Sequence, residues 1–241
     1  MTFTTAMIDD VRAKSDEVVV ALSRDPKLQS YVDTQMPLPK LFHGGGEIRL
    51  VLIGQDPTVE NIETRKKVNT VLMLDRRGHL SNFISNLCAK FGLTLANVYA
   101  TNCCKNFFNQ TPTQIKKKHN IDVITLASQL WLPVLKQELS WLPKATVFTL
   151  GEPVLSVLVR SGFAQNVKSY WGYRQGWNDK GFNDFRQVSA NESAIDRSFF
   201  PFVHLNTSRK SKSGAFYEAR LKSYVEFVQN QIRRESHAWA S

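Results

Sequence analysis

The stretch Ile48-Arg49-Leu50-Val51-Leu52-Ile53 is a short, nearly continuous apolar run with glycine on both sides, at Gly46 and Gly54. A run this short and apolar is typical of a strand buried on both faces of a parallel sheet. Such a sheet requires helices on both faces, because crossover connections join its strands. We therefore take residues 48–53 as the first core strand and work outward from it.

The rest of the chain alternates between helical and strand-like patterns. Apolar spacing predicts helices at about residues 9–22, 80–91, 122–142 and 217–232, with Ser81 as the N-cap of the second. Apolar runs predict further strands at residues 98–102, 145–150 and 199–204. This order predicts an α/β fold with three α/β/α layers and a central, mostly parallel sheet of about four strands.

Length and composition limit the class of protein. At 241 residues, 42% of them hydrophobic, the chain suits one domain with its core at about residues 47–233 and an N-terminal helix and loop at 1–46. The 31 Lys and Arg against 21 Asp and Glu give a net charge of +10, which suits a polyanionic partner such as DNA. Charge alone does not decide this, because many basic proteins bind no nucleic acid.

The cysteines and the apolar runs bear on location. Three cysteines, two of them adjacent at Cys103 and Cys104, favour a reducing compartment over a disulfide framework. No run approaches a membrane span, and the first residues lack the pattern of a signal peptide. We therefore expect a soluble, monomeric, intracellular protein, cytoplasmic or, in a eukaryote, nuclear.

Polar or glycine residues follow each predicted strand at the point where it ends. Ligands of open parallel sheets bind beyond the carboxyl ends of the strands, so these residues should converge there. They are Gln55 and Asp56 after the first strand, Asn102 at the end of the second, Gly151 after the third and His204 at the end of the last.

Four segments resemble signatures of the uracil-DNA glycosylase superfamily, in the order in which the family has them. They span roughly residues 47–217 and are Val51-Leu52-Ile53-Gly54-Gln55-Asp56-Pro57, Tyr99-Ala100-Thr101-Asn102, Leu150-Gly151 and Phe202-Val203-His204-Leu205-Asn206-Thr207-Ser208.

The resemblance implies the fold of that family and a DNA glycosylase of base excision repair that needs no metal or organic cofactor. Such an enzyme flips a nucleotide out of the stack and hydrolyses its N-glycosidic bond. Asp56 would activate water and stabilise the sugar cation, and His204 would donate a hydrogen bond to O2 of the departing uracil. Asn102 would match the uracil edge and reject cytosine. The implied substrate-binding residues are Gly54, Gln55 (through its main chain), Pro57, Thr58, Leu72 and Asn102.

The loop after His204 lies where the family inserts a wedge residue and contacts DNA phosphates. The implied DNA-binding residues are Ser208, Arg209, Lys210, Lys212 and Ser213. A second basic run, Lys116-Lys117-Lys118, is interpreted as a solvated loop.

The chain also departs from the family pattern. Thr58-Val59 stand where the family commonly has Tyr-His, whose tyrosine blocks the thymine methyl, and Leu205-Asn206 follow His204 in place of Pro-Ser. Leu72 or Met73 replaces a phenylalanine that stacks on the base, a contact worth about 1 to 3 kcal/mol. An alternative is therefore a catalytically weak or inactive relative that binds single-stranded or damaged DNA. A nucleotide-binding enzyme on a similar sheet would need a phosphate-cradling glycine-rich loop, which the sequence lacks.

Overall fold

A central five-stranded sheet organises the chain, with the strand order β2-β4-β3-β6-β7. β3, β4, β6 and β7 are parallel, and β2 pairs antiparallel with β4 at one edge. The computed structural model describes residues 5–173, 184–204 and 211–238. The strands are β2 (Phe42–His43), β3 (Leu50–Gly54), β4 (Val98–Asn102), β6 (Thr146–Leu150) and β7 (Phe200–Phe202).

The mostly parallel sheet predicted from the sequence is confirmed, but the count of about four strands was one too low. The additional strand, β2, is only two residues long, which is too short to show the alternation that identifies a strand. A separate two-stranded sheet, which the sequence reading also missed, pairs β1 (Val32–Asp33) with β5 (Phe107–Phe108).

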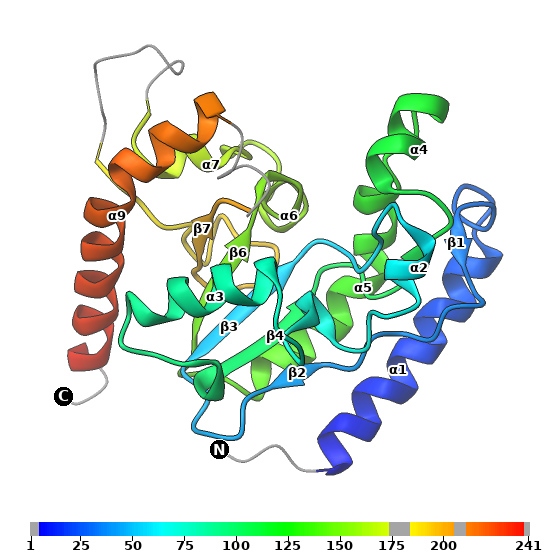
Figure 1. Cartoon of the computed structure of the whole chain (residues 1–241), viewed down its shortest axis with the longest axis horizontal. Helices are drawn as coiled ribbons and strands as arrows, with labels where there is room; N and C mark the ends of the chain where they lie inside the picture. The colour runs from blue at the N-terminus through cyan, green and yellow to red at the C-terminus, as the bar shows by residue number, and fades with distance from the viewer. Residues whose placement is uncertain (1–4, 174–183, 205–210, 239–241) are drawn as a thin grey trace.

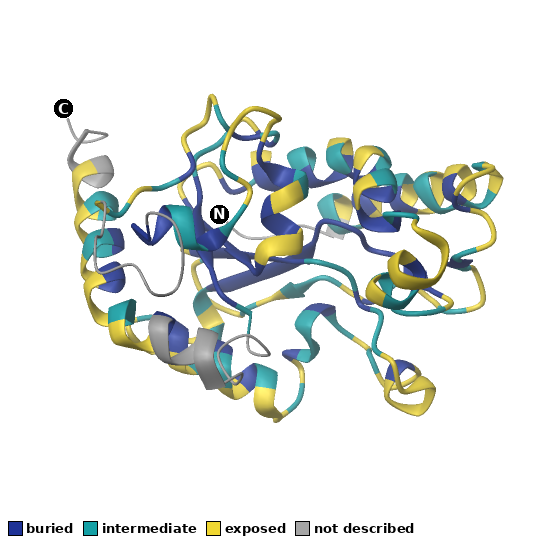
Figure 2. Ribbon diagram, turned by 90° about the horizontal axis from the view of Figure 1, so that it is seen from above, coloured by how far each residue is buried: buried dark blue, intermediate teal, exposed yellow. Residues whose placement is uncertain are grey.

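Helices cover both faces of the central sheet, as the buried strands between partly exposed helices show (Figures 1 and 2). On one face, α5 packs against α1, α4 and α6. On the other, α9 reaches the end of α3, where Gln229 Nε2 donates to the main-chain oxygen of Lys90 at 2.8 Å. The helices are α1 (Thr5–Arg24), α2 (Ile62–Arg65), η1 (Val71–Met73, 3-10), α3 (His79–Ala89), η2 (Leu95–Asn97, 3-10), α4 (Pro112–His119), α5 (Val123–Ser140), α6 (Glu152–Leu158), α7 (Val167–Tyr170) and α9 (Ser211–Ala238).

Most helix ends follow the local sequence, and one expected cap is wrong. Asp122 caps α5 by accepting from the Thr125 amide, and Gly92 follows α3 with a left-handed φ of 66°. Ser81, however, lies inside α3 and bonds back to the main-chain oxygen of Gly78, which is the N-cap residue. The apolar spacing placed the start of this helix to within one residue, whereas the expected N-cap lies three residues too far along the chain.

Aromatic side chains fill the face of the sheet beneath α9. Trp171 stacks on Tyr224 of α9 with ring centroids 4.3 Å apart, and both contact Phe202 of β7 edge to face. Tyr170, Trp171 and Tyr173 are buried, which confirms core packing for this part of the aromatic stretch. The stretch continues to Trp177, which lies outside the described residues.

The α5 face of β4 holds a buried ion pair. Lys105 Nζ lies 2.8 Å from Glu138 Oε2, and the side chains are 5% and 0% exposed. Thr101 of β4 also donates to Glu138 Oε2, at 2.9 Å, and its hydroxyl accepts from Lys105. The pair therefore ties the segment after β4 to α5.

We predict that Lys105→Met destabilises the fold by about 3 to 5 kcal/mol, because it leaves the Glu138 carboxylate buried without a counter-charge. Urea unfolding measures this change. The double variant Lys105→Met/Glu138→Gln should recover most of the loss, since neither charge then remains. A double variant as unstable as the single one would contradict this explanation.

Candidate functional site

Gly54, Asn102 and Leu72 meet at the carboxyl end of the two central strands. Gly54 ends β3 and lies in register with Asn102, which ends β4. A Cβ atom on Gly54 would be 2.5 Å from Asn102 Oδ1 and 2.8 Å from Leu72 Cδ2. Only glycine therefore allows the Asn102 amide and the Leu72 side chain to approach the main chain here.

The Asn102 side chain holds a buried hydrogen-bond acceptor without a partner. Thr101 faces α5, so the next residue along β4 faces the opposite side of the sheet, toward η1. Asn102 is 1% exposed, and its Oδ1 has no hydrogen-bond partner among the described residues. A buried acceptor left unpaired costs about 1 to 3 kcal/mol, so this oxygen is suited to receive a hydrogen bond from a ligand.

The segment that carries Leu72 has a strained backbone. Leu72 and Met73 have φ values of 56° and 51°, the left-handed region that side chains other than glycine rarely adopt. Such residues cost about 1 to 3 kcal/mol each and cluster at ligand sites. Main-chain hydrogen bonds between Lys40 and the residues just before Leu72, Asn69 and Val71, hold the segment in place.

Asp56 begins the loop after β3 and is held on both carboxylate oxygens. Gln55 Nε2 donates to Oδ1 and the Thr58 amide donates to Oδ2, each at 2.9 Å. The residue keeps some exposure, yet crowding of its carboxyl by protein atoms raises the pKa of Asp56 to about 6, against the opposing effects of Thr58, Gln55 and Arg65. Asp56 thus titrates near neutral pH, which suits a group that exchanges protons with water or substrate.

The main-chain oxygen of Gln55 is already occupied. It accepts from the Cys104 amide at 2.9 Å and from the Cys103 thiol at 3.1 Å. A main-chain hydrogen bond from Gln55 to a ligand would therefore have to come from its N–H group.

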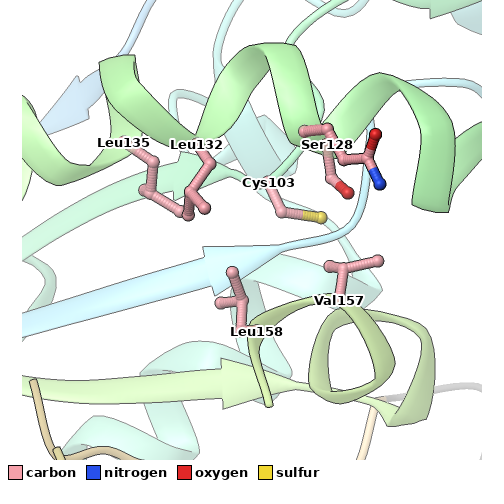
Figure 3. A pocket seen from close by; sticks show the side chains of 7 residues that line it. Cys103, Ser128, Leu132, Leu135, Val157 and Leu158 are labelled. Atoms are coloured by element: carbon pink, nitrogen blue, oxygen red, sulfur yellow. The ribbon is translucent and has the colours of Figure 1, made fainter. Parts of the chain in front are cut away.

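Cys103 also lines a cavity of about 50 Å³ between α5 and α6, which has room for a few water molecules (Figure 3). Because residues of α5 and α6 line it, the cavity lies on the α5 side of the sheet, opposite the side that Asn102 faces.

Thr58 and Arg65 fix the Asp56 loop to the small sheet. The hydroxyl of Thr58 accepts from the Phe108 amide of β5 at 2.8 Å, so this side chain is used within the protein. Arg65, at the end of α2, is 3% exposed and donates to main-chain oxygens of the Asp56 loop and of β5. The sequence reading missed Arg65, because an arginine followed by two lysines has the pattern of a solvated surface.

Gly151 and His204 form a second part of the edge, just beyond the ends of β6 and β7. Gly151 has a φ of 91°, and a Cβ atom there would lie 3.2 Å from the His204 Cβ. Burial lowers the pKa of His204, so its imidazole is neutral at pH 7 and can still donate one N–H. β6 lies between β3 and β7, so the ends of β3 and β7 stand two strand spacings, about 10 Å, apart.

The residues expected to converge thus lie on four adjacent strand ends, in two parts rather than one cluster. Gly54, Gln55, Asp56, Leu72 and Asn102 form the first part, with Pro57 buried and Thr58 turned to β5. Ser208, Arg209 and Lys210 lie outside the described residues, whereas Lys212 and Ser213 belong to the first turn of α9.

Comparison of the chain with protein-family models and with curated proteins finds no match. Among the described residues, no three His, Cys, Asp or Glu side chains gather in a group that could hold a metal ion. The same residues contain no helix both long and apolar enough to cross a bilayer.

The raised pKa of Asp56 predicts that this residue lowers the stability of the fold at neutral pH. The folded pKa of about 6 exceeds the ordinary value of 3.8, so the native state binds more protons between these values and stability falls as pH rises through that window. Above pH 6 the ionised carboxyl costs about 3 kcal/mol. Asp56→Asn should therefore be the more stable protein in urea unfolding at pH 7.5, with the difference shrinking near pH 4. Equal or lower stability of the variant at every pH would contradict the shift.

Proposed function

We propose that the chain is a DNA glycosylase that hydrolyses the N-glycosidic bond of uracil or a related damaged base. The observation that carries the proposal is the Asn102 acceptor, which is buried beside Gly54 at the strand end and has no partner in the part of the chain that the structure describes. The resemblance of four segments to the uracil-DNA glycosylase superfamily and the net charge of +10 support it further.

Asn102 suits a base with a lactam edge. Its Oδ1 can accept the ring N–H of uracil, and its amide nitrogen can donate to the neighbouring carbonyl. Cytosine offers the reverse pattern at this edge, because its ring N3 accepts a hydrogen bond where that of uracil donates one. Asn102 Oδ1 would then face another acceptor and remain unpaired. Hypoxanthine and xanthine also carry an N–H beside a carbonyl, so the same amide can read them.

Asp56 and His204 then act on opposite sides of the bond that breaks. As the C1′–N bond lengthens, its electron pair moves to the base, and His204 donates a hydrogen bond to the oxygen where negative charge builds. Asp56 orients water toward C1′, stabilises the positive sugar and accepts the proton as the C1′–O bond forms. The strand ends that carry the two parts stand about two strand spacings apart, which is comparable to the length of a nucleoside.

A second candidate is a binder of single-stranded or damaged DNA that excises bases slowly or not at all. Leu72 favours it, because its side chain lies against Gly54 where an aromatic ring would stack on the base more strongly. The engagement of Thr58 with β5 also removes one side chain from contact with the base.

A panel of labelled oligonucleotides separates the two candidates. Each carries uracil, hypoxanthine, xanthine or a thymine mismatch, and alkali cleaves the abasic sites after incubation. We expect excision of at least one of these bases, and a loss of about two or more orders of magnitude in Asp56→Asn with DNA affinity unchanged.

The matched control is Asp16→Asn, which removes an exposed carboxylate on α1 and should keep full activity. Tight DNA binding with no excision of any base would support the binder. Equal excision by wild type and Asp56→Asn would remove Asp56 from the mechanism.

A further inference from the structure

We propose that Arg65 is the positioning residue for Asp56, because it clamps the loop that carries Asp56 onto β5. This inference rests on the proposed function, but one of its tests does not require base excision.

Arg65 makes four hydrogen bonds to main-chain oxygens while almost fully buried. Nε and Nη2 donate to Val59 O at 3.1 and 2.9 Å, and Nη1 donates to Phe108 O at 2.9 Å and Asn109 O at 3.2 Å. The planar fork of a guanidinium, with five N–H donors in fixed directions, suits contacts to carbonyls on two separate segments at once.

The burial of the Arg65 charge is unexpected in a run of three basic residues, Arg65, Lys66 and Lys67. Lys66 and Lys67 follow α2 directly and are exposed, and Lys66 pairs with Glu63 at the surface. Arg65 instead turns inward, where its nearest carboxylate, on Asp33 of β1, is 3.8 Å away. Burying a charge with so distant a counter-ion is costly. The carbonyl contacts compensate for that cost, so the clamp specifies where the loop lies.

The Arg65 clamp acts on Asp56 through the short segment from Asp56 to Val59. Val59 accepts from Arg65, and the Thr58 amide donates to Asp56 Oδ2. Thr58 also ties the loop to β5, because its hydroxyl accepts from the Phe108 amide. Both main-chain groups of Phe108 are therefore engaged, its N–H by Thr58 of the Asp56 loop and its C=O by Arg65.

The charge of Arg65 acts on Asp56 in addition. It favours the ionised carboxylate and so opposes the burial that raises the pKa of Asp56. The neighbouring Cys104 thiol has a raised pKa and stays uncharged at neutral pH. Arg65 is thus the cation that acts on this carboxyl, and it also holds the loop in place.

Arg65→Lys separates the two effects, because lysine keeps the positive charge and loses the fork. We expect kcat for base excision to fall on the order of 10- to 100-fold with KM within about twofold, as for a misplaced catalytic group. We also expect the pKa of Asp56, followed by carbon NMR of its carboxyl, to fall from about 6 toward 3.8, because water reaches the loosened loop.

Arg197→Lys is the matched control. Arg197 also makes four hydrogen bonds to main-chain oxygens, those of Leu139, Leu142, Pro143 and Ala145. These bonds lie at the connection between α5 and β6, where β6 begins, far from the carboxyl ends of the strands. The Arg197→Lys variant should lose about as much stability as Arg65→Lys does. It should leave both kcat and the Asp56 titration unchanged.

The proposal is overturned if Arg65→Lys loses stability alone, with the Asp56 titration and excision as in the wild type. Should that variant not fold, Thr58→Val decides, because it removes the other tie to β5 and should lower kcat in the same way, with KM little changed. If wild type excises no base, the proposed function fails, while the carboxyl titration still tests the clamp.

Discussion

The close approach of Asn102 and Leu72 to the main chain at Gly54 is the constraint on which the candidate site depends. Any side chain at position 54 would collide with the Asn102 amide at 2.5 Å. With glycine there, the parallel register of β3 and β4 brings the amide to the strand end where the Asp56 loop begins. The apolar run that fixes β3 in the core thus also fixes where a ligand can meet a polar group.

Several features at this edge cost stability, and much of the packing that stabilises the fold lies elsewhere. The unpaired acceptor of Asn102, the left-handed backbone of Leu72 and Met73 and the buried carboxyl of Asp56 each cost stability. The aromatic cluster under α9 and the carbonyl contacts of Arg197 stabilise the fold away from that edge. Such a distribution is common where function requires groups that the fold alone would not favour.

Elements with a repeating apolar pattern, and polar residues that stand at strand ends, were predictable from the sequence. Features that depend on the tertiary contacts of one side chain were not. The strands β3, β4, β6 and β7 and the long helices follow from runs and spacings of apolar residues. β2 was missed because two residues carry no period, and the N-cap of α3 was misjudged because Ser81 bonds backward inside the helix. Asp56 and Asn102 were found because strand ends are visible in the sequence. Arg65 was not, because burial of one arginine in a basic run depends on carbonyls 43 and 44 residues away.

The central claim is that Asn102 Oδ1 receives a hydrogen bond from the ring N–H of a base. Titration of the labelled protein with free uracil and with N3-methyluracil, which lacks that N–H, tests it most directly by NMR. Uracil should perturb the side-chain amide of Asn102 and the main-chain amides of Gly54 and Gln55, and the methylated base should leave them unchanged. Equal perturbation by both bases, or perturbation confined to residues away from this edge, would contradict the claim.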